Sequence, residues 1–184
     1  MPPLFFGTDA YRDLGRGMGC GMDSAAGFQL PGSFYKMPNE MLKAFLKAAC
    51  GNYLSRGFKL VMIVSGHNAV AQQYLLDELC YEMKSPEGIE PVSFTMEYAV
   101  LEKGDSRRHS DHAGFYETSM MMHLAKGRVN IRANDGYEVA DLAVHTERPV
   151  AEASAAEGAE CFRRQVEGLA LLTKSRAEAV MAPV

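Results

Sequence analysis

The sequence lacks the patterns that would place the protein in a membrane, outside the cell or on nucleic acid. No apolar run approaches the roughly 20 residues that a bilayer-spanning helix needs, and the first residues lack the regions of a signal peptide. The four cysteines form no Cys-x-x-Cys pair, which predicts free thiols in a reducing compartment rather than a zinc ribbon. A formal charge of -4 leaves no basic face to neutralise phosphates. We therefore expect a cytoplasmic protein with no nucleic-acid and no membrane partner.

The sequence does contain a regular alternation of strand and helix patterns. Its 184 residues suffice for one domain with a substantial core but not for two comfortable ones, so we predict a single domain over residues 1–184. Alternating strands and helices predict an α/β fold with a mainly parallel sheet. The expected elements are strands at 3–6, 59–64 and 92–98, a glycine-rich loop at 7–27, helices at 38–56, 69–84, 114–126 and 154–174, and irregular chain or a short strand pair at 127–144.

Apolar spacing also predicts which helix faces are buried. The helix at 69–84 is expected to bury Val70, Tyr74, Leu75, Leu79 and Met83. The last helix is expected to bury Phe162, Val166, Leu169 and Leu172. The run at 59–64 is apolar on both faces, as in a central strand covered by helices.

Two segments carry residues suited to chemistry. The first, Ser65-Gly66-His67-Asn68, directly follows the apolar strand at 59–64, and sites in α/β proteins gather at the carboxyl ends of strands. An imidazole there can bind a metal, or donate a hydrogen bond while a carboxylate orients it. The alternative is a histidine that only satisfies backbone groups of the loop.

The second segment runs from Asp111 to Ser119 and contains His112 and Glu117. Gly114 is expected to open a helix, which places Glu117 in the first turn. There a carboxylate can simply cap free N–H groups and interact with the helix dipole. Asp111, His112 and Glu117 also crowd titratable groups together, which separates their pKa values, as acid–base catalysis requires.

The segment His112-Ala113-Gly114-Phe115-Tyr116-Glu117-Thr118-Ser119 resembles the His-Ala-Gly-x-x-Glu-Thr-Ser signature of the creatininase family of amidohydrolases. Residues 27–33 and 65–68 are similar to that family's Phe-Pro-Gly-Thr turn and Asn-Gly-His-Gly-Gly-Asn loop. The resemblance implies a three-layer α/β/α fold and one or two divalent metals per chain, commonly zinc, manganese or iron. It also implies a homo-oligomer, often a hexamer. The implied reaction is hydrolysis of a cyclic or formyl amide, or opening of a related ring carbonyl compound, in a small-molecule substrate.

The resemblance also implies roles for particular residues. His67 and Glu117 would bind metal, with Asp9 as a further ligand because Thr8-Asp9 imitates a Thr-Asp of the family. His112 and Glu117 would be catalytic, and His112 would move a proton to the leaving group. The expected substrate contacts are Asp111, Asn68 and Ser65.

The sequence departs from the family at its metal ligands. The family supplies most of them from a Glu-x-His segment on its first strand, and no Glu-x-His occurs in this sequence. We therefore expect that first strand to be absent, and Glu97 is a spare carboxylate at a strand end. Two alternatives to a self-sufficient enzyme follow: a non-catalytic scaffold or subunit, and a site completed by a second chain that supplies the missing ligands.

Overall fold

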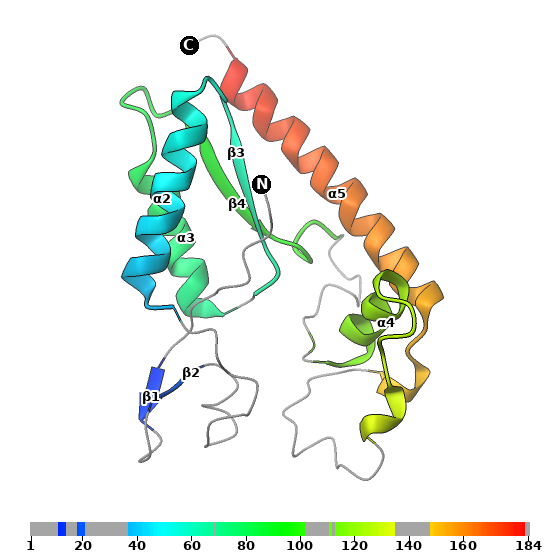
Figure 1. Cartoon of the computed structure of the whole chain (residues 1–184). Coiled ribbons are helices and arrows are strands. Elements are labelled where there is room, and N and C mark those ends of the chain that lie inside the picture. The colour runs from blue at the N-terminus through cyan, green and yellow to red at the C-terminus, as the bar shows by residue number, and fades with distance from the viewer. Residues whose placement is uncertain are drawn as a thin grey trace. The chain divides into compact units, whose positions relative to one another are not determined.

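The computed structural model describes residues 37–67, 69–101, 111, 113–134 and 148–182, together with strand residues 11–13 and 18–20 (Figure 1). Contacts divide the chain into a first unit, residues 1–96 and 173–184, and a second unit, residues 97–172. The elements are β1 (Tyr11–Asp13), β2 (Met18–Cys20), α2 (Asn39–Ser55), β3 (Val61–Ser65), α3 (Val70–Glu82), β4 (Val92–Met96), α4 (Phe115–Leu124), the 3₁₀ helices η2 (Ile131–Asn134) and η4 (Val150–Glu152), and α5 (Ala155–Met181).

The first unit is built on the parallel pair β3–β4, with α2 and α3 side by side next to it (Figure 1). The strands run in register from Val61 opposite Val92 to Ser65 opposite Met96, so both end at the same edge of the sheet. Leucines from the two helices form a buried cluster against this sheet, with Ile63 and Phe94 packed on it. The cluster consists of Leu42, Leu46, Leu75, Leu76 and Leu79. Parallel strands joined through a helix confirm the predicted α/β character.

The second unit holds α4 and the part of α5 up to residue 172. Its contact between helices depends on glycine. A Cβ at Gly158 of α5 would lie 1.9 Å from the carbonyl oxygen of Ser119 in α4. The hydroxyl of Ser119 accepts a hydrogen bond from the backbone N–H of Ser154 at 3.1 Å, just before α5 begins. This close approach holds the start of α5 against α4.

Most predicted elements are confirmed to within a few residues, with two exceptions. The sequence predicts a loop at residues 7–27, but β1 and β2 within this range form an antiparallel pair, with Tyr11 opposite Cys20. Glycine weakens a helix, yet a short two-stranded ladder needs only backbone hydrogen bonds. The last helix extends to Met181 rather than 174, because the residues after 174 are good helix formers although the apolar pattern has ended. The strand predicted at 3–6 lies outside the described residues.

The predicted buried faces are partly wrong. In α3 Leu75 and Leu79 are buried, but Val70 is 65% and Tyr74 is 71% exposed. In α5 Phe162 and Val166 are 38% and 48% exposed. The buried positions of α5 are instead Gly158, Cys161 and Gln165.

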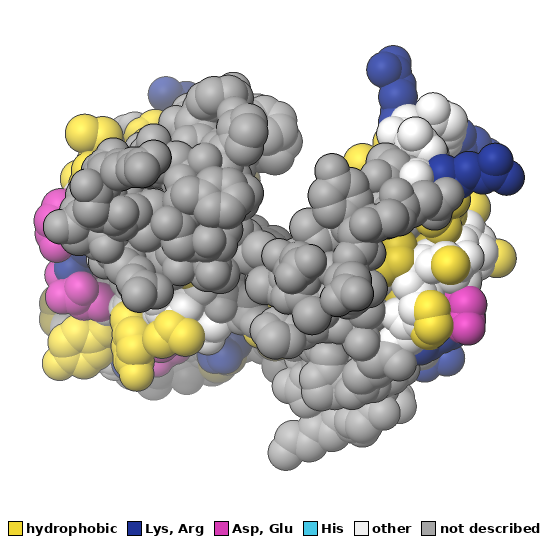
Figure 2. Space-filling model, turned by 90° about the horizontal axis from the view of Figure 1, so that it is seen from below, with side chains coloured by type: hydrophobic (Ala, Val, Ile, Leu, Met, Phe, Trp, Pro, Cys, Tyr) yellow, Lys and Arg dark blue, Asp and Glu magenta, His cyan; other side chains and the backbone are white. Residues whose placement is uncertain are grey.

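The contact with Ser119 accounts for the α5 error, because backbone approach of this kind requires small residues at the interface. Val64 of β3 is 48% exposed, so the expectation of a strand covered on both faces is also wrong. Figure 2 shows hydrophobic side chains at the surface beside acidic and basic ones.

Among the cysteines whose side chains the structure describes, all are free thiols, as predicted: Cys50, Cys80 and Cys161. Burial raises the pKa of the Cys80 thiol to about 11, which keeps it protonated at neutral pH. Among the helices that the structure describes, none combines the length and the apolar character needed to cross a bilayer.

Candidate functional site

The amino-terminal end of α4 is held by a carboxylate from outside the helix. The N-cap residue is Gly114, which has no side chain to bond the free amides of the first turn. Asp111 takes this role: its Oδ2 accepts from the Tyr116 N–H at 2.7 Å and its Oδ1 from the Glu117 N–H at 3.0 Å. Asp111 is only 2% exposed. A buried carboxylate is stable here because it bonds two amides and faces the positive end of the helix dipole.

The backbone before α4 adopts an unusual conformation at Ala113, whose φ is +51°. This left-handed region disfavours residues with a Cβ by about 1 kcal/mol or more. Two side chains of α4 hold it in place. The Ala113 N–H donates to Oε2 of Glu117 at 2.9 Å, and the Thr118 hydroxyl donates to the Ala113 carbonyl at 3.1 Å. Hydrogen bonds therefore hold both the N–H and the carbonyl of Ala113, the residue that follows His112 in the chain.

Glu117 has both the position and the exposure that a ligand-binding carboxylate needs. It lies in the first turn of α4, as predicted, and is exposed to solvent. Its bond to Ala113 fixes one carboxylate oxygen and so sets the direction of the group. The capping role foreseen as the alternative is thus present, and it leaves Glu117 accessible.

Glu97, which follows the last residue of β4, is the second carboxylate of this region. Its Oε2 is buried, and no donor among the described residues reaches it. Burial raises the pKa of Glu97 above its usual range, and the negative charge of Glu117 raises it further. Burying a carboxylate oxygen that no donor reaches is costly, and a neighbouring carboxylate adds to that cost. This pair would be stabilised by a proton or by a cation.

In the first unit, the chain that follows β3 forms a structured loop at His67. His67 is exposed and lies two residues beyond the end of β3. The hydroxyl of the buried Ser65 donates to the His67 carbonyl at 2.9 Å and accepts from the His67 N–H at 3.3 Å. The loop that carries the imidazole is thus folded around one serine.

A scan against models of protein families matches this chain over residues 18–173 to the model described as "Creatininase: Creatinine amidohydrolase". The chain belongs to the creatininase family. The match covers most of the chain and includes residues of both compact units. No curated protein and no solved structure matches the chain. Membership supports hydrolysis of amides with a divalent metal in general terms, as the family is one of amidohydrolases.

Within the creatininase signature, most residues have a structural role in this chain. Phe115 is fully buried and Tyr116 nearly so, and their rings meet edge to face at 5.0 Å. The guanidinium of Arg148 lies 3.7 Å from the centre of the Phe115 ring and pairs with Glu157 of α5 at 3.2 Å. These contacts anchor α4 and leave Glu117 as the solvent-facing carboxylate of the signature.

The predicted site residues fall into three groups. Asp9, Asn68 and His112 lie outside the described residues. Asp111 and Glu117 are brought together through the amide of Glu117, and Ser65 is brought together with His67. Those bonds do not test substrate contact by Asp111 or Ser65.

A metal shared by His67 and Glu117 likewise stays a prediction, since these two residues belong to different compact units. In the parts of the chain that the structure describes, no group of three His, Cys, Asp or Glu residues is placed to hold a metal. The single-domain prediction is also untested.

Sequence reasoning did not include Glu97 or Gln72 among the site residues. Glu97 had a usable signal, because it directly follows a strand and is a carboxylate. Gln72 had none, because its partner, Ser65, became apparent only from the fold: the Gln72 Nε2 donates to the Ser65 hydroxyl at 2.8 Å.

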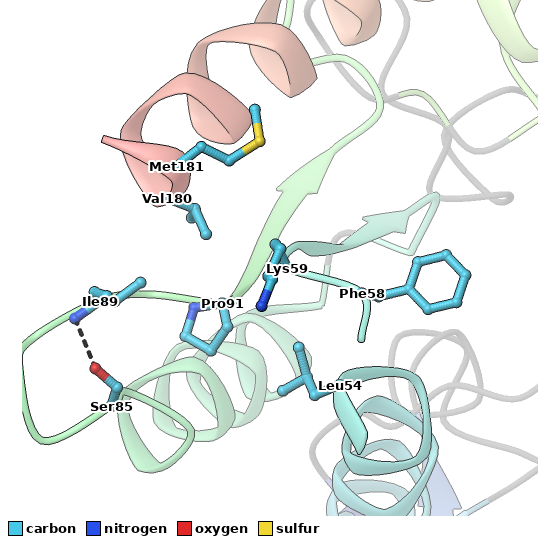
Figure 3. Close-up of a pocket in the computed structure, with 8 residues that line it drawn as sticks. All are labelled: Leu54, Phe58, Lys59, Ser85, Ile89, Pro91, Val180 and Met181. Atoms are coloured by element: carbon cyan, nitrogen blue, oxygen red, sulfur yellow. Dashed lines mark hydrogen bonds between the residues drawn. The ribbon is translucent and has the colours of Figure 1, made fainter. Parts of the chain in front are cut away.

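An apolar groove of about 570 Å³ lies at the other end of the strands, where β3 and β4 begin (Figure 3). Leu54, Ile89 and Pro91 line it together with Val180 and Met181 of α5, and Lys59 is the cation among its lining residues. In α/β sheets the chemistry belongs to the carboxyl ends of the strands. The groove is therefore separate from the loop of His67.

Proposed function

We propose that this chain is a metal-dependent hydrolase of the creatininase type that cleaves the C–N bond of a cyclic or formyl amide, or opens a related ring carbonyl compound. The family match supports the reaction class. The observation that carries the proposal is the carboxylate pair: an accessible Glu117 fixed by Ala113, and Glu97 with a buried oxygen that no described donor reaches. A divalent cation would offset the charge that makes this pair unfavourable.

The donor set fits such a cation in part. Carboxylate oxygens and imidazole nitrogens bind zinc, manganese and iron, so Glu117 and Glu97 would be ligands in the second unit and His67 a ligand in the first. Asp9 is the further ligand that the sequence suggests. A bound divalent ion supplies Lewis acidity, which polarises a carbonyl and acidifies water.

The remaining steps belong to residues of the chain. Asp111 and Ala113 hold the first turn of α4, so Glu117 faces the reacting atoms in a fixed direction. His112 would transfer a proton to the leaving nitrogen. Glu97 would accept or hold a proton whenever it is not binding the cation, since burial favours its neutral form. The three-layer α/β/α arrangement and a homo-oligomer, often a hexamer in the family, are part of the same proposal.

A non-catalytic scaffold or subunit is the second candidate. The observation favouring it is that the described residues contain no group of three metal-binding side chains, together with the lack of Glu-x-His in the sequence. A partner chain that supplies the remaining ligands would give the same picture.

Metal content separates these candidates. Protein purified without chelator would be analysed for zinc, manganese and iron by plasma mass spectrometry, with Glu97→Gln and His67→Ala alongside. We expect about one or more metal ions per chain, reduced in both variants. Metal far below one per chain in the folded wild type would refute the self-sufficient enzyme and support the scaffold.

A further inference from the structure

A buried glutamine of α3 reaches back to the strand that carries the His67 loop. Gln72 is 8% exposed and Ser65, the last residue of β3, is 6% exposed. The Gln72 Nε2 donates to the Ser65 Oγ at 2.8 Å. A leucine at this position would bury more apolar area, whereas the amide and the hydroxyl must be removed from water, and the hydrogen bond between them offsets that cost.

The hydrogen bonds of the Ser65 hydroxyl leave it no freedom. A serine hydroxyl has one proton to donate and two lone pairs that accept. The proton goes to the His67 carbonyl, and the lone pairs receive the His67 N–H and the Gln72 Nε2–H. Because the proton is committed to His67, only a donor at position 72 can complete the set. The bond from Gln72 thus adds a third constraint on the Ser65 hydroxyl, beside its two bonds to the backbone of His67.

We propose that Gln72 is a positioning residue for His67: through Ser65 it holds the loop in the conformation in which the imidazole binds metal. The inference rests on the proposed function for the identity of the ligand. Outer groups that orient a metal ligand commonly contribute 10- to 100-fold to metal affinity. A side chain on a helix does so with more precision than a loop residue would.

The test uses zinc affinity of the full chain, measured by competition with a chromophoric chelator. Gln72→Met keeps length and volume but removes the donor, and we expect zinc to bind about 10-fold or more weakly. Ser65→Ala should weaken binding at least as much, and Ser65→Thr, which keeps the hydroxyl, should restore it. Gln165→Met is the matched control, because Gln165 is also a buried helical glutamine, 7% exposed, and lies in the second unit.

A second readout requires no metal. Hydrogen exchange of the metal-free protein reports on the His67 amide directly, and thermal midpoints show whether each variant is folded. Faster exchange at His67 with weaker zinc binding in Gln72→Met, and neither change in Gln165→Met, supports the proposal. Unchanged exchange and unchanged affinity overturn it.

The two hypotheses fail in different ways. If the wild type binds zinc and His67→Ala binds it equally well, the role of His67 in the proposed function is wrong. The part of the inference that concerns metal is then wrong as well. Hydrogen exchange at the His67 amide alone then decides whether Gln72 holds the loop. If His67→Ala loses zinc while Gln72→Met retains it fully, the ligand assignment stands and the positioning role of Gln72 is refuted.

Discussion

Gly114 lies so close to Asp111 that a Cβ at position 114 would be 2.4 Å from the Asp111 Oδ2. This distance is shorter than any ordinary contact between these atoms. A glycine is therefore required at position 114, because only a residue without a side chain allows the Asp111 carboxylate to reach the amides of Tyr116 and Glu117. The cap of α4 is therefore supplied by a residue three positions before the N-cap glycine. The stability of this helix end depends on that residue.

Asp111→Ala should destabilise the protein by about 2 kcal/mol or more. The change leaves two first-turn amides without an acceptor, that of Tyr116 buried and that of Glu117 partly buried, and such a loss costs about 1–3 kcal/mol for a buried group. Urea unfolding followed by circular dichroism measures the difference. Asp77→Ala, which removes an exposed aspartate from α3, is the control and should change stability by less than about 0.5 kcal/mol. Equal effects of the two changes would contradict the assignment of Asp111 as the cap.

Two helical glycines should respond in opposite directions to alanine. A Cβ added at Gly51 of α2 would meet no neighbouring side chain within 4 Å, so Gly51→Ala should stabilise the fold by up to about 1 kcal/mol through helix propensity. At Gly158 the added carbon would overlap the Ser119 carbonyl, and Gly158→Ala should cost about 1–3 kcal/mol. Thermal unfolding of both variants tests the contact between α4 and α5. Similar gains at both sites would show that no close contact exists.

Glu97→Gln should raise stability at neutral pH and leave it unchanged in acid. Below the ordinary glutamate pKa of about 4.3 the group is neutral in the folded and the unfolded chain, and it costs nothing. As pH rises, the unfolded chain ionises first because burial raises the pKa in the folded state. The wild type therefore loses stability as pH rises from the unfolded to the folded pKa and stays less stable above it, whereas the variant does not.

Thermal midpoints of the two proteins between about pH 3 and pH 8, without metal, measure this divergence. Glu87→Gln is a control of opposite sign, because a hydrogen bond from Ser85 lowers the pKa of Glu87. Parallel profiles for the wild type and Glu97→Gln would mean that Glu97 is not desolvated.

Glu117→Gln and Glu117→Ala should separate capping from metal binding. The amide oxygen of glutamine can still accept from the Ala113 N–H, so the first change should keep stability within about 0.5 kcal/mol and reduce bound metal about 10-fold or more. The second change should lose both the metal and about 1 kcal/mol of stability. Metal content and urea midpoints of the two variants provide the test. Full metal retention in Glu117→Gln would remove this residue from the ligand set.

The sequence is sufficient to predict the order α2, β3, α3, β4, α4 and α5 and the start of α4. Gly114 and the first-turn Glu117 are local signals, and local signals need no knowledge of the rest of the chain. The cap from Asp111 was not predicted, because it depends on the backbone bending back at Ala113. Spacing shows which groups are near in sequence but not which amides they meet, and a substrate contact by Asp111 stays a prediction.

Burial in α3 shows more clearly what the apolar pattern of a sequence leaves undecided. The helix carries apolar residues around most of its circumference, so the pattern favours a face with Val70 and Tyr74 as well as one with Leu76. The fold selects the second, and that face includes Gln72 because Ser65 is there to meet it. A pairing between a strand end and the next helix becomes visible only after the strand and helix have been packed.

In the signature, the Ala-Gly-Phe-Tyr stretch and the final Thr-Ser are needed for folding, and this affects which residues related proteins retain. In this chain they set a backbone turn, fill the interior and hold one helix on another. A relative without hydrolytic activity would still have to retain them in order to fold. The presence of the signature is therefore better evidence of common ancestry than of present activity. Under the proposed function, a loss of catalysis would first appear as changes at the ionisable groups Glu117, Glu97 and His67.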